Sequence, residues 1–244
     1  MLYKNQIKLI KSLTQKKYRQ QYGLFTVEGI KGISEFLNSD YILDTLYTTQ
    51  SVFNAPKHLT VFISEEELQK VSALKTPNTA LAIFRIPKPK SVKDNGLIIA
   101  LDTINDPGNL GAIIRLCDWY NVLQIVCSKD TVDCYNQKVV QATMGSLARV
   151  NITYLDLEVY LNNYSNTIFG TFMTGKNIYT TRLPNTGIIV FGNEANGISE
   201  LLKTKIDKQL TIPQFGKQQS TESLNVANAV AIILSEFKRQ STET

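Results

Sequence analysis

The stretch LIIALDTINDPGNLGAIIR (97–115) decides the fold of the C-terminal half of the chain. It begins with a continuous apolar run, passes through the turn-forming residues NDPGN (105–109) and continues with apolar residues at helical spacing. A continuous apolar strand that leads into a helix is typical of parallel sheets, because both faces of such sheets are buried. We therefore expect an α/β fold here, with Asn109 capping the helix.

The same alternation of apolar strands and helices extends to the C-terminus. Strands are expected within 97–104, 123–128, 151–156, 167–174 and 187–194, and helices at 110–120, 136–148, 157–164, 199–204 and 224–239. This pattern predicts a mostly parallel sheet with helices on both faces.

The N-terminal half has a looser pattern and ends in a linker. Helices are expected at 4–20 and 30–38, and strands at 24–29 and 79–86. Ser64 and Glu67 form a capping box before a further helix. The segment IPKPKSVKDNG (86–96) is rich in proline and lysine. We therefore predict a small α/β domain at 1–86, a linker at 87–95 and a second domain at 96–244.

Positive charge is concentrated in the N-terminal half of the chain. Residues 1–95 carry 14 Lys and Arg against 8 Asp and Glu, whereas residues 96–244 carry 12 against 13. The first 22 residues contain six basic side chains and no acidic one. Such a cluster attracts a polyphosphate backbone, although a lysine-rich helix can also be simply a solvated surface.

Composition argues against several other classes of protein. No apolar run is long enough for a membrane span, and the N-terminus lacks the features of a signal peptide, so cytoplasmic residence without membrane contact is expected. Three cysteines, no CxxC pair and the single histidine His58 argue against both a disulfide framework and a metal site.

Three segments of the C-terminal half combine a strand end with a glycine-, asparagine- or proline-containing turn and a helix start. They are LDTINDPGNLGAIIR (101–115), FGNEANGIS (191–199) and IPQFGKQQSTESLNVANAVAII (212–233). Ligands of open α/β sheets collect at the carboxyl ends of the strands. Taken singly, each segment can also be an ordinary loop; together they predict one binding site.

In order and spacing, these segments resemble the three motifs of the SpoU (TrmH-type) family of ribose 2′-O-methyltransferases, in the SPOUT superfamily. Asp102 with DPGNLGAIIR (106–115) matches the first motif, GNEANGIS (192–199) the second, and IPQFG (212–216) with SLNV (223–226) the third. The resemblance covers about 130 residues. KKYR (16–19) and LFTVEGIKGISEFL (24–37) more weakly resemble the family's substrate-binding domain.

The resemblance implies the site residues and the cofactor, S-adenosyl-L-methionine. The family's catalytic positions fall on Asn109, Arg115, Glu194, Ser223 and Asn225. Its cofactor-binding positions fall on Gly192, Ile212 and Leu224. The resemblance also implies a deep trefoil knot and a homodimer. This chain departs from the family pattern in the longer loop KQQST (217–221) and in the bulky helix end WYN (119–121), which we interpret as a packing or dimer contact.

The implied reaction is methyl transfer to a ribose 2′-hydroxyl of RNA, and the two-domain layout favours ribosomal over transfer RNA. Arg115 is expected to stabilise the developing alkoxide, since a guanidinium is a poor base. Lys16, Lys17 and Arg19 are the expected RNA-binding residues, with Tyr18 and Phe25 as possible stacking partners. A side chain added at Gly192 is expected to occupy the cofactor's space.

Other functions stay open at this point. They are a transfer-RNA ribose methyltransferase, a base methyltransferase of the same superfamily, and an RNA-binding protein that keeps the fold without catalysis.

Overall fold

The computed structural model describes residues 2–77, 79–216 and 223–242, and the chain divides into two compact units. Unit 1 comprises Met1–Lys88 and Asp133–Arg149, and unit 2 comprises Pro89–Val132 and Val150–Thr244. The chain therefore crosses from one unit to the other three times, after Lys88, Val132 and Arg149. The prediction had a single crossing, through the linker at 87–95. The longer loop KQQST (217–221) lies outside the described residues.

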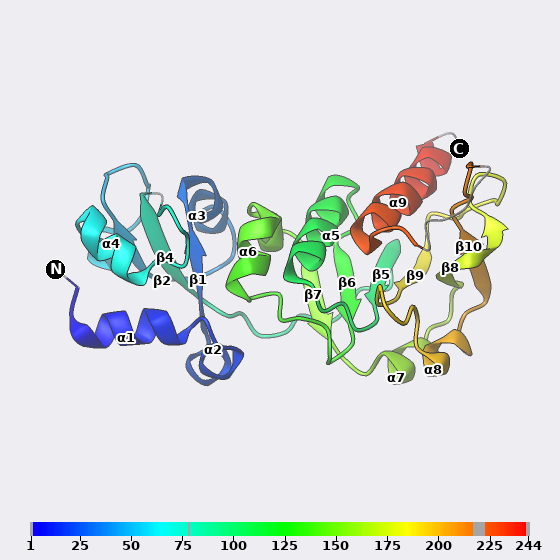
Figure 1. The fold of residues 1–244 in the computed structure, drawn as a ribbon, viewed down its shortest axis with the longest axis horizontal. Coiled ribbons are helices and arrows are strands. Elements are labelled where there is room, and N and C mark those ends of the chain that lie inside the picture. Colours follow the sequence, from blue (N-terminus) through cyan, green and yellow to red (C-terminus); the bar gives the residue numbers. More distant parts are fainter. Residues whose placement is uncertain (1, 78, 217–222, 243–244) are drawn as a thin grey trace. The chain divides into compact units, whose positions relative to one another are not determined.

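Unit 1 is built on a four-stranded sheet in the order β1-β4-β2-β3 (Figure 1). Its strands are β1 (Leu24–Glu28), β2 (Leu43–Thr48), β3 (Thr60–Phe62) and β4 (Ala80–Arg85). Its helices are α1 (Lys4–Ser12), α2 (Lys16–Tyr22), α3 (Ile30–Leu37), α4 (Glu65–Val71) and α6 (Gln137–Thr143), with 3₁₀ turns η1 (Lys57–Leu59) and η2 (Ser146–Ala148). The predicted capping box opens α4, since Ser64 Oγ accepts from Glu67 N at 3.2 Å and Glu67 Oε2 accepts from Ser64 N at 3.1 Å.

The prediction of one helix over residues 4–20 is wrong, because the chain turns between α1 and α2. At this turn, Arg19 Nη1 donates hydrogen bonds to the carbonyl oxygens of Leu13 (2.9 Å) and Thr14 (2.8 Å). In a continuous helix those oxygens would accept from backbone N–H groups four residues further on. The buried arginine therefore holds the corner between the two helices.

Arg19 also forms an ion pair with Asp133, a residue of unit 1 that is distant in the sequence. Its Nη2 and Nε atoms donate to Asp133 Oδ2 at 2.6 and 2.9 Å, and the side chain is only 2% exposed. The prediction that Arg19 contacts RNA phosphate is therefore wrong, since its guanidinium is enclosed and already bonded. Phe25 is fully buried as well, so it is a core residue and not a stacking partner.

Residues 133–149 belong to unit 1 although the sequence places them among the strands of the C-terminal sheet. Gln137 Nε2 donates to the buried Glu28 Oε1 at 2.6 Å, and Arg149 forms an ion pair with Glu35. The Tyr135 ring lies 4.7 Å from the Phe25 ring, centroid to centroid. These contacts explain why α6 and η2 pack with the N-terminal residues.

Unit 2 contains the predicted sheet of parallel strands, in the order β10-β8-β9-β5-β6-β7. Its strands are β5 (Leu97–Leu101), β6 (Gln124–Cys127), β7 (Asn151–Tyr154), β8 (Ile168–Asn177), β9 (Gly187–Phe191) and β10 (Lys208–Thr211). The fold-class prediction is confirmed. The sequence pattern missed β10, because this short edge strand contains a single apolar residue, Leu210.

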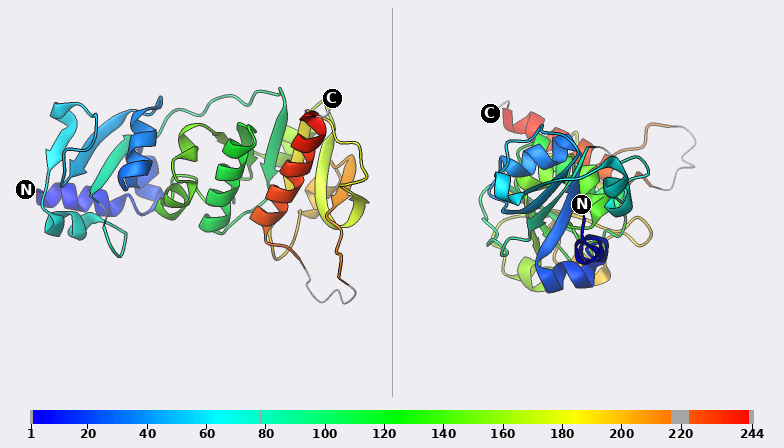
Figure 2. Two further views of the ribbon diagram at one scale, coloured as in Figure 1. Left: turned by 90° about the horizontal axis from the view of Figure 1, so that it is seen from above. Right: turned by 90° about the vertical axis from the view of Figure 1, so that its left-hand side faces the viewer.

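Helices cover both faces of this sheet. They are α5 (Pro107–Trp119), α7 (Leu157–Asn162), α8 (Glu200–Lys203) and α9 (Val226–Thr242). Leu157, Leu161 and Leu202 of α7 and α8 pack on one face in a single apolar cluster with strand residues such as Ile98 and Val190. On the other face α5 and α9 lie side by side (Figures 1 and 2), and Phe237 of α9 packs edge-on against Phe169 at 5.3 Å. Within the described residues, no helix is both long and apolar enough to cross a membrane.

Candidate active site

The three motif segments follow the carboxyl ends of β5, β9 and β10, which lie at the same edge of the parallel sheet. β5 pairs in parallel with β9, so the loops that follow Leu101 and Phe191 leave the same edge of the sheet. The loop after β5 leads directly into α5. Asp106 caps this helix by accepting a 2.8 Å hydrogen bond from Asn109 N. The prediction that Asn109 is the cap is therefore wrong: it lies in the first turn, and its side chain is left available for other contacts.

Asn109 joins the first and third motifs through its side-chain amide. Asn225 Oδ1 accepts from Ala227 N (2.9 Å) and Asn228 N (3.4 Å) at the start of α9. The Asn225 amide nitrogen therefore donates to Asn109 Oδ1 at 2.9 Å. This contact in turn directs Asn109 Nδ2 toward Glu194 Oε1 of the second motif, to which it donates.

These bonds form a chain Asn225–Asn109–Glu194 in which the orientation of each amide is fixed by its neighbour. Glu194 and Asn225 are exposed and Asn109 is half-buried. A substrate can therefore reach a carboxylate and two amides whose positions are already set. Preorganised polar groups of this kind orient a reacting group without the cost of rearranging on binding.

The loop that carries Glu194 is folded by Asn193 and Gly197. Their backbones form a pair of hydrogen bonds, Asn193 N to Gly197 O at 3.0 Å and Gly197 N to Asn193 O at 2.7 Å. The Asn193 side chain donates to Thr103 O at 2.8 Å and accepts from Ala195 N at 2.8 Å. The loop is thus attached to the end of β5.

Asp102 and Thr103 complete this attachment. Buried Asp102 accepts from Ser199 N at 2.8 Å, just before α8. Thr103 has a left-handed φ of +59°, which is rare for a β-branched residue and indicates local strain. Sequence reasoning did not assign roles to Asn193, Asp102 or Thr103. The turn residues around them were a usable signal, but a backbone dihedral cannot be read from residue types.

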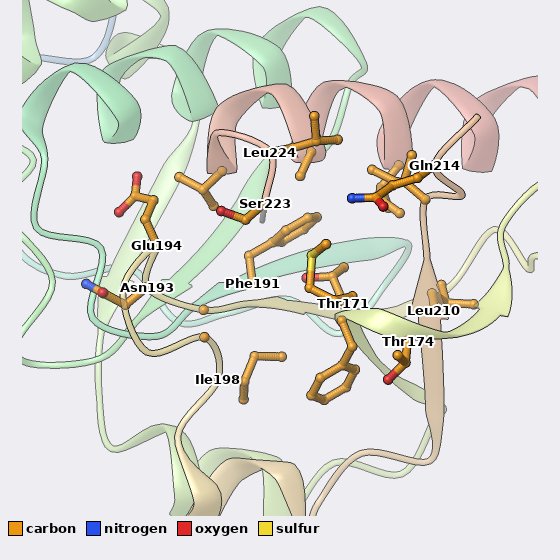
Figure 3. Close-up of a pocket in the computed structure, with 18 of the residues that line it drawn as sticks. Thr171, Thr174, Phe191, Asn193, Glu194, Ile198, Leu210, Gln214, Ser223 and Leu224 are labelled. Carbon is orange, nitrogen blue, oxygen red and sulfur yellow. The ribbon is translucent and has the colours of Figure 1, made fainter. Parts of the chain in front are cut away.

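A cavity of about 800 Å³ lies between the loops after β9 and β10 and the start of α9 (Figure 3). Its lining includes all three predicted cofactor residues, Gly192, Ile212 and Leu224. Glu194 and Ser223 lie toward one end of the cavity and Gln214 and Thr174 toward the other. The other lining side chains are mainly apolar: Phe172, Met173, Phe191, Ile198, Leu210, Pro213, Phe215, Val226, Ala229 and Ile233. Among the described residues, the charged members of the lining are Glu194 and Lys203.

Gly192 contributes its backbone to this cavity, but the reason predicted for its importance is wrong. A Cβ atom at Gly192 would collide with the backbone of Gly197 and Ile198 across the loop. A side chain there would distort the loop rather than fill the ligand's space, so loss of binding in a Gly192 variant would not identify the pocket.

Arg115 is the predicted catalytic residue that the fold does not place beside the other four. It follows Asn109 by six residues, which places it roughly 120° away around α5. The side chain is exposed, is not part of the cavity lining, and makes no hydrogen bond or ion pair within the part of the chain that the structure describes. No group of His, Cys, Asp and Glu in that part could hold a metal ion.

Comparison with known proteins identifies the family of this chain. The sequence profile of the SpoU rRNA Methylase family matches residues 96–235, and that of the MRM3-like substrate binding domain matches residues 4–82. The chain is 28% identical to the Bacillus subtilis 23S rRNA (guanosine(2553)-2′-O)-methyltransferase RlmP, with 95% of each chain covered.

Solved structures give the same result. One from Porphyromonas gingivalis, described as an RNA methyltransferase of the TrmH family, is 36% identical with a TM-score of 0.90, covering 98% of this chain and 99% of that one. An AdoMet-bound rRNA methyltransferase from Sinorhizobium meliloti is 27% identical with a TM-score of 0.85, covering 98% and 96%. The family profile spans more than half of the sequence and the fold matches over nearly its whole length, so this chain belongs to the SpoU rRNA methylase family.

Proposed function

We propose that this protein transfers a methyl group from S-adenosyl-L-methionine to a ribose 2′-hydroxyl of ribosomal RNA. The observation that carries the proposal is the position of the cavity beside the Asn225–Asn109–Glu194 chain. The names of the relatives support ribosomal rather than transfer RNA, because RlmP and the RlmB proteins are 23S rRNA 2′-O-methyltransferases.

The residues of the cavity fit S-adenosyl-L-methionine. A volume of about 800 Å³ lies within the range of small-molecule sites. Apolar side chains such as Leu210, Ile212 and Leu224 suit an adenine ring, while Lys203 and Glu194 offer one charge of each sign to the amino-acid part. When bound, the cofactor supplies an activated methyl group whose sulfonium is already a good leaving group. The protein therefore has to position the hydroxyl and stabilise the negative charge that develops as the hydroxyl loses its proton.

The hydrogen-bonded residues Asn225, Asn109 and Glu194, together with Ser223 and Arg115, carry out these tasks. Asn109, Asn225 and Ser223 orient the ribose, and Glu194 anchors Asn109. Arg115 stabilises the developing alkoxide, since a charged guanidinium is a strong donor and a poor base, and the proton leaves by way of a phosphate oxygen of the RNA substrate. Lys16 and Lys17 are exposed in unit 1 and contact RNA phosphates.

Arg115 performs this role in a homodimer, in the site of the partner. Two observations support this arrangement: Arg115 forms no hydrogen bond or ion pair within the described residues, and Trp119, four residues later on the same side of α5, is 84% exposed. A second copy covering α5 would bury the tryptophan and give the arginine its partners. The trefoil knot of the family and a cytoplasmic location, where ribosomal RNA is found, complete the proposal.

Calorimetric titration with S-adenosyl-L-methionine tests the cofactor site. Val226, Ala229 and Ile233 line the cavity from one side of α9, so Ala229→Phe is expected to fill the space and abolish detectable binding. Ser235→Phe places the same bulk on an exposed position of α9 outside the cavity and should bind like the wild type. Equal affinity of Ala229→Phe and wild type would show that the cofactor binds elsewhere.

The Asn193 side chain should matter through the loop that it holds. Asn193→Ala removes the bonds to Thr103 O and Ala195 N, and is expected to weaken cofactor binding about two- to tenfold. Asn196→Ala is the matched control, since Asn196 is exposed on the same loop and makes no side-chain bond within the described residues. Equal affinities for the two variants would mean that Asn193 does not position the loop.

A further inference from the structure

Two hydroxyl side chains of the loop after β6 hold the turn that follows β5. Ser128 Oγ accepts a hydrogen bond from Thr103 N at 2.9 Å, and Thr131 Oγ1 accepts from Ile104 N at 3.2 Å. Thr131 and Ile104 are buried, and a buried N–H group without a partner is costly. The two hydroxyls therefore satisfy successive backbone donors that the strands of the sheet do not.

The hydroxyl protons of these two residues have defined directions. Thr131 Oγ1 lies 3.2 Å from Leu101 O, which can only accept, and 3.1 Å from Ser128 Oγ. The arrangement that uses both contacts has Thr131 donating to the carbonyl oxygen and Ser128 donating to Thr131. Each hydroxyl then both donates and accepts, so the two side chains form one hydrogen-bonded unit between the end of β5 and the loop after β6.

This unit holds Thr103 in a conformation that a threonine rarely adopts. Its φ of +59° lies in the left-handed region, where the Cβ atom crowds the backbone. The bonds to Ser128 and Thr131, together with a 2.8 Å bond from Val132 N to Ile104 O, fix the turn on both sides of Thr103. Without the hydroxyls the turn is expected to relax.

The peptide unit between Thr103 and Ile104 connects this turn to the active-site loop. Its N–H group donates to Thr131, and its carbonyl oxygen, Thr103 O, accepts from Asn193 Nδ2 at 2.8 Å. A peptide unit is planar and rigid, so a rotation that moves its N–H group also moves its oxygen. The Thr131 hydroxyl therefore sets the position of the oxygen to which Asn193 is bonded.

Asn193 in turn holds the loop that carries Glu194. The backbone pair between Asn193 and Gly197 closes this loop around Glu194, whose carboxylate accepts from Asn109. The position of the carboxylate thus depends on a buried hydroxyl that is not part of the described cavity lining.

We propose that Ser128 and Thr131 are positioning residues of the active site, which act on the Glu194 loop through the Thr103–Ile104 peptide unit. Both lie outside the three motif segments of the sequence. Their effect on the loop is a property of the protein alone. Their effect on cofactor binding rests on the proposed function.

Hydrogen–deuterium exchange of the unliganded protein, followed by mass spectrometry of its peptides, tests the positioning. Thr131→Val keeps the volume of the buried side chain and removes the hydroxyl, so the amides of 193–197 should exchange about two- to tenfold faster than in the wild type. Thr131→Ser removes the methyl group but keeps the hydroxyl, and should exchange like the wild type in this loop. Equal exchange of 193–197 in the two variants would overturn the proposal.

Ser128→Ala removes the acceptor of Thr103 N and should accelerate exchange of 193–197 in the same way. Thr143→Val is the matched control, because Thr143 is a fully buried threonine of unit 1 whose hydroxyl donates to Val140 O at 2.7 Å. It should leave exchange of 193–197 unchanged. An equal acceleration by Thr143→Val would show a general loss of stability and would also overturn the proposal.

Calorimetry with S-adenosyl-L-methionine tests the consequence for the cofactor site. Thr131→Val should weaken binding about two- to tenfold by itself and add nothing to Asn193→Ala, because both substitutions remove the same attachment. Additive losses in the double variant would overturn the route through Asn193. A wild type that fails to bind the cofactor would count against the proposed function alone, because exchange in the unliganded protein still decides whether the hydroxyls position the loop.

Discussion

Arg115→Ala is expected to lower the rate of methyl transfer by about 10²–10³-fold while cofactor affinity stays close to that of the wild type. Arg115 is exposed, outside the cavity lining, and has no bonding partner within the described residues, so its removal disturbs neither the cavity nor the fold. Arg115→Lys should restore little activity, because lysine lacks the planar set of donors.

Single-turnover methylation of the RNA substrate, combined with calorimetry, measures these two quantities separately. Arg182→Ala is the matched control, since Arg182 is also exposed in unit 2 and unpaired within the described residues; it should keep full activity. Wild-type turnover by Arg115→Ala would remove the residue from the mechanism.

Mixing of two inactive variants tests whether Arg115 acts in the partner's site. A heterodimer of Arg115→Ala with Asn109→Ala would contain one intact site if Arg115 crosses the interface, and none if it acts within its own subunit. We expect activity to reappear on mixing, with each heterodimer about half as active as a wild-type dimer because one of its two sites is intact. Mixtures that remain inactive after verified subunit exchange would assign Arg115 to its own subunit.

Arg19→Ala is expected to lower the free energy of unfolding by about 3–5 kcal/mol. The substitution leaves the Asp133 carboxylate, whose side chain is 13% exposed, without its charged partner. It also removes the donor from the Leu13 and Thr14 carbonyl oxygens. Arg19→Lys should recover part of this loss at most, because a single ammonium cannot reach all of these acceptors in the same geometry.

Urea unfolding followed by circular dichroism measures this effect. Arg85→Ala is the control, because Arg85 is 62% exposed and lies 3.9 Å from Asp44, a surface pair expected to contribute less than about 1 kcal/mol. An Arg19 variant no less stable than the Arg85 variant would show that the buried pair does not hold the corner of unit 1.

The parallel sheet of unit 2 could be predicted because its strands are continuous apolar runs separated by turn residues. LIIAL (97–101) and GIIVF (187–191) are buried along their whole length, so their composition follows from their position. The motif segments were identified from their place at the ends of these strands. The family and the methyltransferase function implied by the resemblance agree with the comparisons.

The features that could not be predicted depend on contacts between residues far apart in the sequence. Arg19 appeared to be one more member of a basic run, yet its partner Asp133 lies 114 positions away. Arg19 also bonds the Leu13 and Thr14 carbonyl oxygens at the turn that interrupts the helix expected at 4–20, and its pair with Asp133 accompanies the packing of residues 133–149 with unit 1. At the candidate site, the order Asn225–Asn109–Glu194 depends on which amide atom caps α9, and residue types alone do not specify that choice.

Mass spectrometry of the methylated product distinguishes ribose methylation from base methylation. Ribosomal RNA lacking its ribose methyl groups is incubated with the purified protein and S-adenosyl-L-methionine carrying an isotopically labelled methyl group, then digested to nucleosides. We expect one labelled nucleoside whose added mass remains with the ribose when the glycosidic bond breaks, and no label with the Ala229→Phe variant. A label that remains with the base, or an unlabelled product from protein shown to bind the cofactor, would contradict ribose 2′-O-methylation.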